Sequence, residues 1–353
     1  MKVAIIGGGL SGLSCAFELK KHGIIPTVFE KKIYIGDHLD YTIVFLRIFD
    51  PFFETPIKYL NKNYGLKIKP LNQLNKITML GPTKKTTIHG KLGFIFKKNR
   101  ESDSLENQIL KQLDLPIIFD KYIHPKDFKN DFDAIVCANG DNLFSNELNN
   151  WHTTLSTHSR IATVIGDFNP NALTMWLNTK YTKHVYAYML PFSKDKANLT
   201  LTVENSSYDE LDYYWKKFLN LENINYHILE TRDIEHTAGR VDTLKLDNIY
   251  FTGNSAGLLG NLLGFGAMNA IESGILVGKA IAKNLDYNEM MTPILKNIAY
   301  LYRFRKKMNT FTNKDYDRLI SFLGLPLIKQ YIYNNPFYKV LKKTSIQDHL
   351  SKK

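Results

Sequence analysis

The stretch Lys2-Val-Ala-Ile-Ile-Gly-Gly-Gly-Leu-Ser-Gly12 decides the fold of this chain. Its apolar run is followed by a glycine turn, by helical spacing over residues 13–22, and by a second short run, Thr27-Val-Phe-Glu30. A strand, a helix and a strand in this order predict a βαβ unit. We therefore expect an α/β fold that is organised around a parallel sheet.

The glycine turn has the residues that a phosphate-binding turn requires. Gly7 permits a tight bend out of the strand, Gly9 lets a pyrophosphate approach the backbone, and Gly12 lets the helix pack closely on the strand. At Leu10 and Ser11 the start of the helix offers free N–H groups and the positive end of the helix dipole. The turn therefore predicts an anion-binding site.

Glu30 adds an acidic side chain at the end of the second strand. A carboxylate at this position can accept hydrogen bonds from the ribose of a nucleotide. Strand, helix and acid are in register, so we predict nucleotide binding. The alternative is a βαβ turn that is buried without a ligand.

The composition is that of an ordinary globular protein, with 353 residues, 44% apolar and 23% charged. This length predicts two domains. The net charge of +12 is concentrated at one end, because residues 291–353 hold 13 Lys and Arg against 3 Asp and Glu. Such a tail predicts contact with an anionic surface such as lipid headgroups, and its alternative is a solvated helical face.

Two cysteines, Cys15 and Cys137, fall in apolar segments where we expect them to be buried. No disulfide framework and no metal site are expected, so a reduced cytosol fits this chain. The fold begins at the N-terminus, which leaves no room for a signal peptide. Residues 248–271 carry no charge, but their glycines and asparagines predict a loop and a buried helix rather than a membrane span. We expect a cytoplasmic protein, either free or peripheral at the inner face of the membrane.

Further elements are predicted between the first unit and residue 150. In chain order they are a loop at 31–50, a helix at 52–64, antiparallel strands at 76–80, 86–89 and 92–96, a helix at 104–113, and a buried strand at 131–140. Ser104 is the expected cap of its helix, and the last strand is expected beside the first one.

Residues 151–235 are rich in β-branched and aromatic residues and predict a separate antiparallel sheet with helices. The expected elements are strands at 161–165, 184–190 and 199–203, a helix at 209–221, and a return to the parallel sheet at 248–252. The predicted domains are a Rossmann-like FAD-binding domain with a β-meander (1–75, 95–150 and 236–290), an α+β substrate domain (151–235, with 76–94 as a candidate addition), and a basic C-terminal helical segment (291–353).

A second glycine-rich stretch, Gly253-Asn254-Ser-Ala-Gly257, follows the returning strand. Gly264-Phe265-Gly266 then opens a helix over residues 267–282, which again offers backbone N–H groups to a negative or electron-rich ligand. Two such sites, one near each end of the chain, indicate a long cofactor. FAD is the natural candidate, with its pyrophosphate at the first site and its ribityl chain and isoalloxazine near the second.

These motifs resemble those of the geranylgeranyl reductase family of FAD-dependent oxidoreductases, within the larger group that includes the aromatic hydroxylases. The opening, Gly7-x-Gly9-x-x-Gly12 with Glu30 and Lys31, is similar to that of the family. Tyr186-Ala-Tyr188-Met-Leu-Pro-Phe192 is similar to its aromatic–proline motif, and residues 253–274 are similar to its flavin-side motif. The resemblance extends over most of residues 1–285 and implies FAD binding.

The resemblance also assigns residues beside the cofactor. It puts Lys98 near the phosphates and Gly140 near the adenosine, with a surface lysine and a structural turn as the alternatives. Asn254 stands where the family usually has an aspartate that accepts from the ribityl chain; an amide can accept and also donate. The loop after Glu30 lacks the cysteine of many family reductases and offers His38 instead.

Family membership implies that reduced flavin passes a hydride to a double bond of a polyprenyl chain, with a proton added from the site. Tyr186 and Tyr188 are candidates to line the substrate pocket, or are ordinary core residues of a strand. His38 is a candidate acid, because histidine titrates near neutral pH, or is a surface histidine.

Three functions stay open from the sequence. They are an FAD-dependent reductase of isoprenoid or other lipid chains, an FAD-dependent monooxygenase of the hydroxylase type, and a nucleotide- or lipid-binding protein without redox turnover. The electron donor of an enzyme would be NAD(P)H, bound transiently, or a ferredoxin-like protein. No nucleic-acid recognition module is visible, so nucleic acid is not an expected partner.

Overall fold

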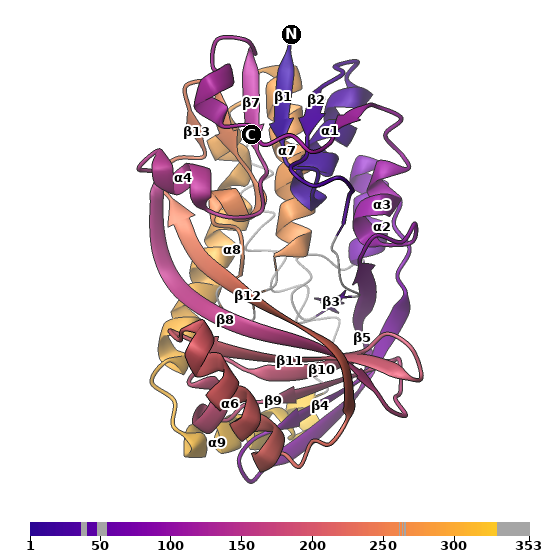
Figure 1. Cartoon of the computed structure of the whole chain (residues 1–353), viewed down its shortest axis with the longest axis vertical. Helices are drawn as coiled ribbons and strands as arrows, with labels where there is room; N and C mark the ends of the chain where they lie inside the picture. The colour runs from indigo at the N-terminus through magenta and orange to yellow at the C-terminus, as the bar shows by residue number, and fades with distance from the viewer. Residues whose placement is uncertain (37–40, 48–54, 261, 263, 265, 330–353) are drawn as a thin grey trace.

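The computed structural model describes residues 1–36, 41–47, 55–260, 262, 264 and 266–329. Two sheets dominate the fold, one of six strands and one of eight (Figure 1). The first is largely parallel and carries the βαβ unit, the second is largely antiparallel, and helices near the C-terminus pack against both. This is the predicted α/β fold class.

The six-stranded sheet contains the predicted βαβ unit. In spatial order its strands are β13 (Lys245–Leu246), β14 (Ile249–Phe251), β7 (Ala134–Cys137), β1 (Val3–Ile6), β2 (Thr27–Phe29) and β6 (Ile117–Ile118). All pairs are parallel except β13 with β14. The chain continues from β1 to β2 on one side and returns to β7 on the other. Open sheets of this kind bind ligands at this switch point, outside the carboxyl ends of the strands.

Helices α1 (Leu10–Lys21) and α7 (Ala267–Lys283) pack together on this sheet. Their backbones approach closely, because a Cβ at Gly274 would lie 2.2 Å from the carbonyl oxygen of Ser11. Cys15 and Cys137 are buried and not disulfide-bonded, which confirms their predicted burial. Burial raises the pKa of both thiols, which keeps them protonated and unreactive.

Shorter helices cover the remaining edges of this sheet. They are α2 (Pro56–Tyr64), α3 (Leu105–Leu110), the 3-10 helix η2 (Pro125–Phe128) and α4 (Leu143–Glu147). The side chain of Ser104 accepts from the backbone N–H of Asn107, which confirms it as the cap of α3. α2 begins at Pro56 with Thr55 as its cap, four residues after the predicted start, and residues 52–54 lie outside the described residues.

The eight-stranded sheet is antiparallel except where β4 pairs with β9. In spatial order its strands are β12 (His227–Val241), β8 (Trp151–Ile165), β11 (Lys196–Glu204), β10 (Ala187–Pro191), β9 (Ala172–Trp176), β4 (Asn72–Leu80), β5 (Lys85–Lys98) and β3 (Tyr41–Leu46). β8 and β12 are the long curved pair that extends from this sheet towards α4 (Figure 1). The same two strands thus connect both sheets.

Two predictions for residues 31–96 are wrong. The segment predicted as a loop at 31–50 contains β3, which pairs with β5 and whose Thr42 bonds to Asn198 on β11. The three strands predicted over 76–96 are two, because β5 runs on through Gly90 and Gly93. A Cβ at Gly93, which lies inside a predicted strand, would be 2.3 Å from the carbonyl oxygen of Phe45, so this glycine marks the close approach of β3 to β5.

Helix α6 (Tyr208–Leu221) covers the outer face of the eight-stranded sheet together with the single turn α5 (Thr179–Thr182). Ser207 and Glu210 form a capping box that begins α6. The buried rings of Trp215 and Phe218 pack towards the sheet, where Phe218 meets Trp176 edge to face at 5.4 Å. These aromatic residues therefore attach a helix to the sheet.

The basic tail forms α8 (Tyr287–Met308), α9 (Asn313–Leu323) and α10 (Pro326–Lys329), and residues 330–353 lie outside the described part. α9 buries Tyr316 and Ile320 against the sheet. Arg305 of α8 is 1% exposed and pairs with Glu204 of β11 at 3.6 Å, so it does not belong to the basic surface that the sequence indicated. Among the described helices, none has the length and apolar character needed to span a membrane.

Candidate functional site

The carboxyl ends of four parallel strands bring the two glycine-rich stretches together. Ile6 pairs with Phe29 and with Cys137, and Cys137 pairs with Phe251. The residues that follow β1, β2, β7 and β14 therefore meet at one edge of the sheet. Two segments that are some 240 residues apart in the chain become neighbours because of this register.

The glycine turn is as tight as its sequence predicted. Gly7 has a φ of +109°, and a Cβ there would lie 2.3 Å from the carbonyl oxygen of Ala138. A Cβ at Gly12 would lie 1.9 Å from the carbonyl oxygen of Gly7, so only glycine lets α1 pack this closely on the turn. At Gly9 a Cβ would meet nothing within 4 Å, which leaves an open approach to its backbone.

The N-terminus of α1 faces that open space. Gly9 is the N-cap residue, it provides no side-chain cap, and the first turn carries no acidic residue. The first N–H groups of a helix have no acceptor within the helix. Together with the positive end of the helix dipole, they form a site for an anion such as a pyrophosphate.

Glu30 closes this end of the site. Its two carboxylate oxygens accept from the backbone N–H groups of Gly8, at 2.7 Å, and of Lys32, at 2.9 Å. These bonds fix the carboxylate beside the turn and leave further lone pairs for a ribose hydroxyl. Lys31, the next residue, pairs with Asp141 at 3.6 Å, so a cation and an anion flank the same edge.

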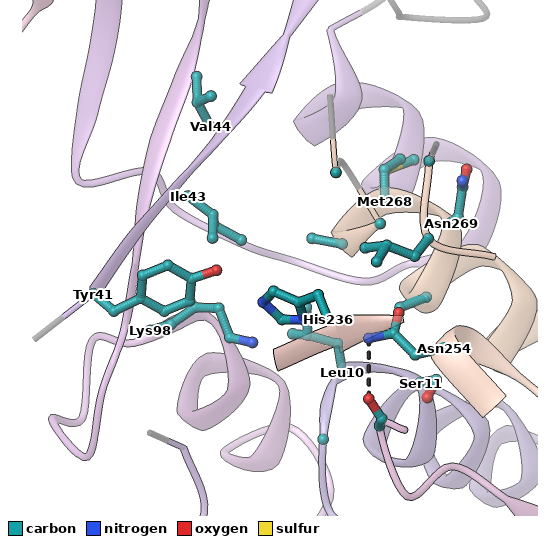
Figure 2. Close-up of a pocket in the computed structure, with 18 of the residues that line it drawn as sticks. Leu10, Ser11, Tyr41, Ile43, Val44, Lys98, His236, Asn254, Met268 and Asn269 are labelled. Atoms are coloured by element: carbon teal, nitrogen blue, oxygen red, sulfur yellow. Dashed lines mark hydrogen bonds between the residues drawn. The ribbon is translucent and has the colours of Figure 1, made fainter. Parts of the chain in front are cut away.

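The second glycine-rich stretch lies directly against the first. It begins as the 3-10 helix η3 (Gly253–Ala256), and a Cβ at Gly253 would lie 2.7 Å from Ser11 Oγ. The amide of Asn254 donates to the carbonyl oxygen of Gly140 at 3.1 Å, and this bond is drawn in Figure 2. The bond uses the donor of the amide and leaves its oxygen as an acceptor towards the site.

A cavity of about 690 Å³ connects this edge to the eight-stranded sheet. At one end it is lined by the glycine turn and by Asn254. At the other end it reaches the inner face of the sheet, where alternate residues of neighbouring strands line it: Leu155, Thr157, Ser159, Ile161, Leu173, Met175, Thr200, Thr202, Arg232, Ile234, His236 and Ala238. Ile294 and Leu301 of α8 complete the wall.

Most residues that the sequence singled out line this one cavity. They are Gly7, Gly9, Leu10, Ser11, Glu30, Lys31, Lys98, Gly140, Tyr186, Tyr188, Asn254, Gly264 and Gly266. Three further glycines lie behind the wall and allow close packing there. Gly12 faces the backbone of Gly7, Gly253 faces Ser11, and Gly257 faces the backbone of Gly239. His38 and Phe265 lie outside the described residues.

Lys98 lines the cavity from the end of β5 and pairs with Glu106 of α3 at 3.0 Å. Its side chain is 22% exposed, so it lies partly buried in the wall of the cavity. Glu106 is 3% exposed and also lines the cavity, and its second oxygen is buried without a hydrogen-bond partner in the structure. A buried carboxylate oxygen of this kind can accept from a donor on a ligand.

Tyr186 and Tyr188 line the cavity beside β10, with ring centroids 6.0 Å apart. Burial raises the pKa of both hydroxyls, so both stay protonated and can donate. The hydroxyl of Tyr186 lies near Gly264, since a Cβ on that glycine would be 3.3 Å from it. Both tyrosines also pack against the core of the eight-stranded sheet, so each side chain combines the two roles that the sequence left open.

Several lining residues carry polar side chains that sequence reasoning missed. They are Tyr41 of β3, Arg232 and His236 of β12, Tyr59 of α2 and Glu272 of α7. Figure 2 shows His236 between Lys98 and Asn254 in this view, with Tyr41 beside Lys98. Only the two residues of β12 have a signal in the sequence. Arg232, Ile234, His236 and Ala238 are spaced two residues apart, which puts all four on one face of the strand.

Comparisons with known proteins agree with this architecture. Residues 5–45 match the family model for the NAD(P)-binding Rossmann-like domain. That segment holds the end of β1, the glycine turn, α1, β2 and most of β3. The glycine turn and the helix that follows it are the part that binds a nucleotide in Rossmann-like folds.

Solved structures match over nearly the whole chain. A geranylgeranyl bacteriochlorophyll reductase-like protein from Thermoplasma acidophilum has 15% identity and a TM-score of 0.72, with 98% of each chain covered. A p-nitrophenol 4-monooxygenase from Pseudomonas putida has 11% identity and a TM-score of 0.63, with 96% of this chain and 97% of that chain covered. A flavin-dependent brominase has 14% identity and a TM-score of 0.60, with all of both chains covered.

At these identities the likeness shows a shared fold. The shared parts are the Rossmann-like parallel sheet, the curled antiparallel sheet and the helices that follow them. The names of the three proteins point to different reactions, so the fold by itself does not select one. The chain has the two-sheet fold that these three solved structures adopt.

Proposed function

We propose that the protein is an FAD-dependent oxidoreductase that reduces carbon–carbon double bonds of a polyprenyl or similar lipid-like substrate. The observation that carries the proposal is the continuity of the cavity, which joins the anion site at α1 to the apolar face of the eight-stranded sheet. A polar end and an apolar end in one space suit a dinucleotide and a lipid chain that react with each other.

The residues at the polar end fit FAD. The backbone at Gly9 is open to a pyrophosphate, and the N–H groups of Leu10 and Ser11 lie at the N-terminus of α1. Glu30 retains lone pairs for a ribose, and the oxygen of Asn254 can accept from a ribityl hydroxyl. The volume of about 690 Å³ lies in the range that ligand sites occupy.

FAD, when bound, supplies the hydride for the reduction. The chain supplies the surroundings that an unactivated double bond requires. Ile161, Leu173 and Met175 present apolar side chains that exclude water from the sheet end, and Tyr186 and Tyr188 present hydroxyls that keep their protons. A water-poor pocket also strengthens every hydrogen bond made inside it.

The proposal includes an electron donor and a membrane surface as partners. Reducing equivalents would come from NAD(P)H or from a ferredoxin-like protein. Contact with an anionic membrane is supported by α8, whose Tyr300 and Phe304 are 56% and 47% exposed in the same stretch as Lys306 and Lys307. Leu301, on the same helix, lines the cavity, so a lipid chain would have a short way from that surface to the site.

The absorbance spectrum of the purified protein tests the cofactor first. We expect a yellow protein that releases FAD, identified by its mass, on denaturation. A colourless protein that also fails to take up added FAD would contradict the proposal and leave the non-redox alternative.

Product mass tests the reaction. The flavin is reduced without oxygen and then mixed with a polyprenyl lipid. A product heavier by two hydrogen atoms supports the reductase. A product that gains one oxygen atom when oxygen and NAD(P)H are supplied would favour the monooxygenase instead.

A further inference from the structure

Three oxygen atoms form a closed triangle where α2 meets α7. The hydroxyl of Tyr59 lies 2.7 Å from Glu272 Oε1, the hydroxyl of Tyr64 lies 3.2 Å from the same oxygen, and the two hydroxyls are 3.1 Å apart. Glu272 and Tyr59 both line the cavity. The triangle is therefore part of the wall of the site, although none of its residues belongs to a glycine-rich stretch.

The number of protons in this triangle decides the state of Glu272. Each of the three contacts needs one proton between its two oxygens. The two tyrosines supply one each, and an ionised carboxylate supplies none. Burial raises the pKa of both tyrosines, so neither gives its proton up. The third contact becomes a hydrogen bond only when Glu272 carries a proton.

The surroundings of Glu272 favour the same state. Burial raises the pKa of its carboxyl, and the hydrogen bonds from Tyr59 and Tyr64 oppose this only in part. The charged groups of α1 beyond Tyr64 are engaged with one another. Lys21 lies 3.1 Å and His22 lies 3.2 Å from Glu18, while Lys21 also donates to the backbone oxygen of Tyr64 at 2.8 Å.

We propose that Glu272, buried and closed into a ring with Tyr59 and Tyr64, rests as a neutral carboxylic acid, and that it donates its proton to the substrate in the cavity. The donor role rests on the proposed reduction, whereas the resting protonation does not. Both tyrosines contact Oε1, so Oε1 carries the proton of the resting ring, and Glu272 faces the cavity as one of its lining residues.

The O–H bond of Glu272 breaks, and its electron pair stays on the carboxylate. The proton and the π electrons of the alkene form a C–H bond at the carbon that does not receive the hydride. Both tyrosines donate to Oε1 and stabilise the carboxylate that forms. Water returns a proton to Glu272 before the next turnover.

Infrared spectroscopy at neutral pH tests the resting state. We expect the carbonyl stretch of a protonated carboxyl in the wild-type protein and its loss in E272Q. The matched control is E222Q, because Glu222 also accepts from a buried tyrosine, Tyr181, at 2.8 Å but does not line the cavity. If E272Q keeps every protonated-carboxyl band of the wild type, the proposal is overturned.

A second variant keeps this test decisive if E272Q does not fold. In Y64F one hydrogen bond to the ionised form is lost, so the band should persist to a higher pH than in the wild type. The matched control is Y287F, because Tyr287 is a buried tyrosine that donates to the backbone oxygen of Phe251 instead. An unshifted band in Y64F would contradict a ring that includes Tyr64.

Single-turnover kinetics test the donor role. Without oxygen, E272Q should bind FAD in the wild-type amount but react with a polyprenyl substrate about 100-fold more slowly or worse. Equal rates would overturn the donor role and leave the proposed function intact. A wild-type protein that binds FAD and reduces no alkene would overturn both the function and the donor role, while the infrared result still decides whether Glu272 is protonated.

Discussion

The two ends of the cavity are built in different ways. The end at the glycine turn is built from closely packed backbone. A Cβ at Gly7, Gly12 or Gly253 would lie 1.9 to 2.7 Å from a neighbouring atom, which is too close for any residue but glycine. The sheet end is made of side chains that come from β3 and from six other strands of one sheet. A backbone site requires glycine at fixed spacing, whereas a side-chain site requires only that strands pair in the right order.

The largest loss of stability is expected for a substitution at the backbone end of the cavity. G12A would place its Cβ 1.9 Å from the carbonyl oxygen of Gly7, and neither backbone segment can move away. We expect a loss of more than about 4 kcal/mol, seen as a loss of soluble folded protein.

The control for that substitution is G9A, whose Cβ meets nothing within 4 Å. It should fold normally and bind FAD more weakly, as measured by flavin fluorescence. If G9A unfolds as readily as G12A, the two glycines do not have the separate roles assigned to them.

A smaller loss is expected where α8 is held to the sheet end. E204A leaves the guanidinium of Arg305 buried without its charge partner. Uncompensated burial of this kind costs about 3 to 5 kcal/mol, which urea denaturation would measure. D247N removes the exposed ion pair with Lys129 and should leave the midpoint almost unchanged. Similar losses in both variants would mean that Arg305 is solvated in the protein.

A still smaller effect is expected at the contact between the glycine-rich stretches. N254D introduces the aspartate that the resembling family usually carries, but it replaces a donor that bonds to the carbonyl oxygen of Gly140. We expect a loss of about 1 to 3 kcal/mol in unfolding free energy. N288D is the control, because Asn288 accepts from the backbone N–H of Leu244 and a carboxylate can still do so. A more stable N254D would show that Asn254 is not held as a donor.

The smallest expected effect is a change in how steeply the free energy of unfolding depends on pH. The pKa of Glu272 is raised by burial, so its contribution to stability is complete at low pH and is lost as the pH rises through the folded-state pKa. E272Q has no such group and should lose less stability between about pH 5 and about pH 8. Urea denaturation across that range measures both proteins. Parallel curves would mean that Glu272 ionises in the folded protein as it does in the unfolded chain.

Most of the fold was visible in the sequence, because most elements carry their own local signals. The βαβ unit, the cap at Ser104, the aromatic helix α6 and the helix α7 begin or end within a few residues of their predicted places. β3 was missed because it is stabilised by pairing with β5 and by Asn198 of β11, whose partner residues lie 47 to 156 positions away in the chain. Gly90 was predicted as a turn because a glycine between two apolar runs is a local turn signal, whereas β5 continues through it.

The candidate site divides in the same way. The sequence by itself determined the glycine turn, Glu30 and the second glycine-rich stretch, because close backbone approach allows only glycine and fixes the spacing. Only the tertiary structure decided that Lys98 faces Glu106, that Arg232 and His236 join the wall, and that Tyr59 and Tyr64 meet Glu272. Polar side chains occur on many strands and helices, and which of them share a cavity depends on pairing and packing between segments far apart in the chain.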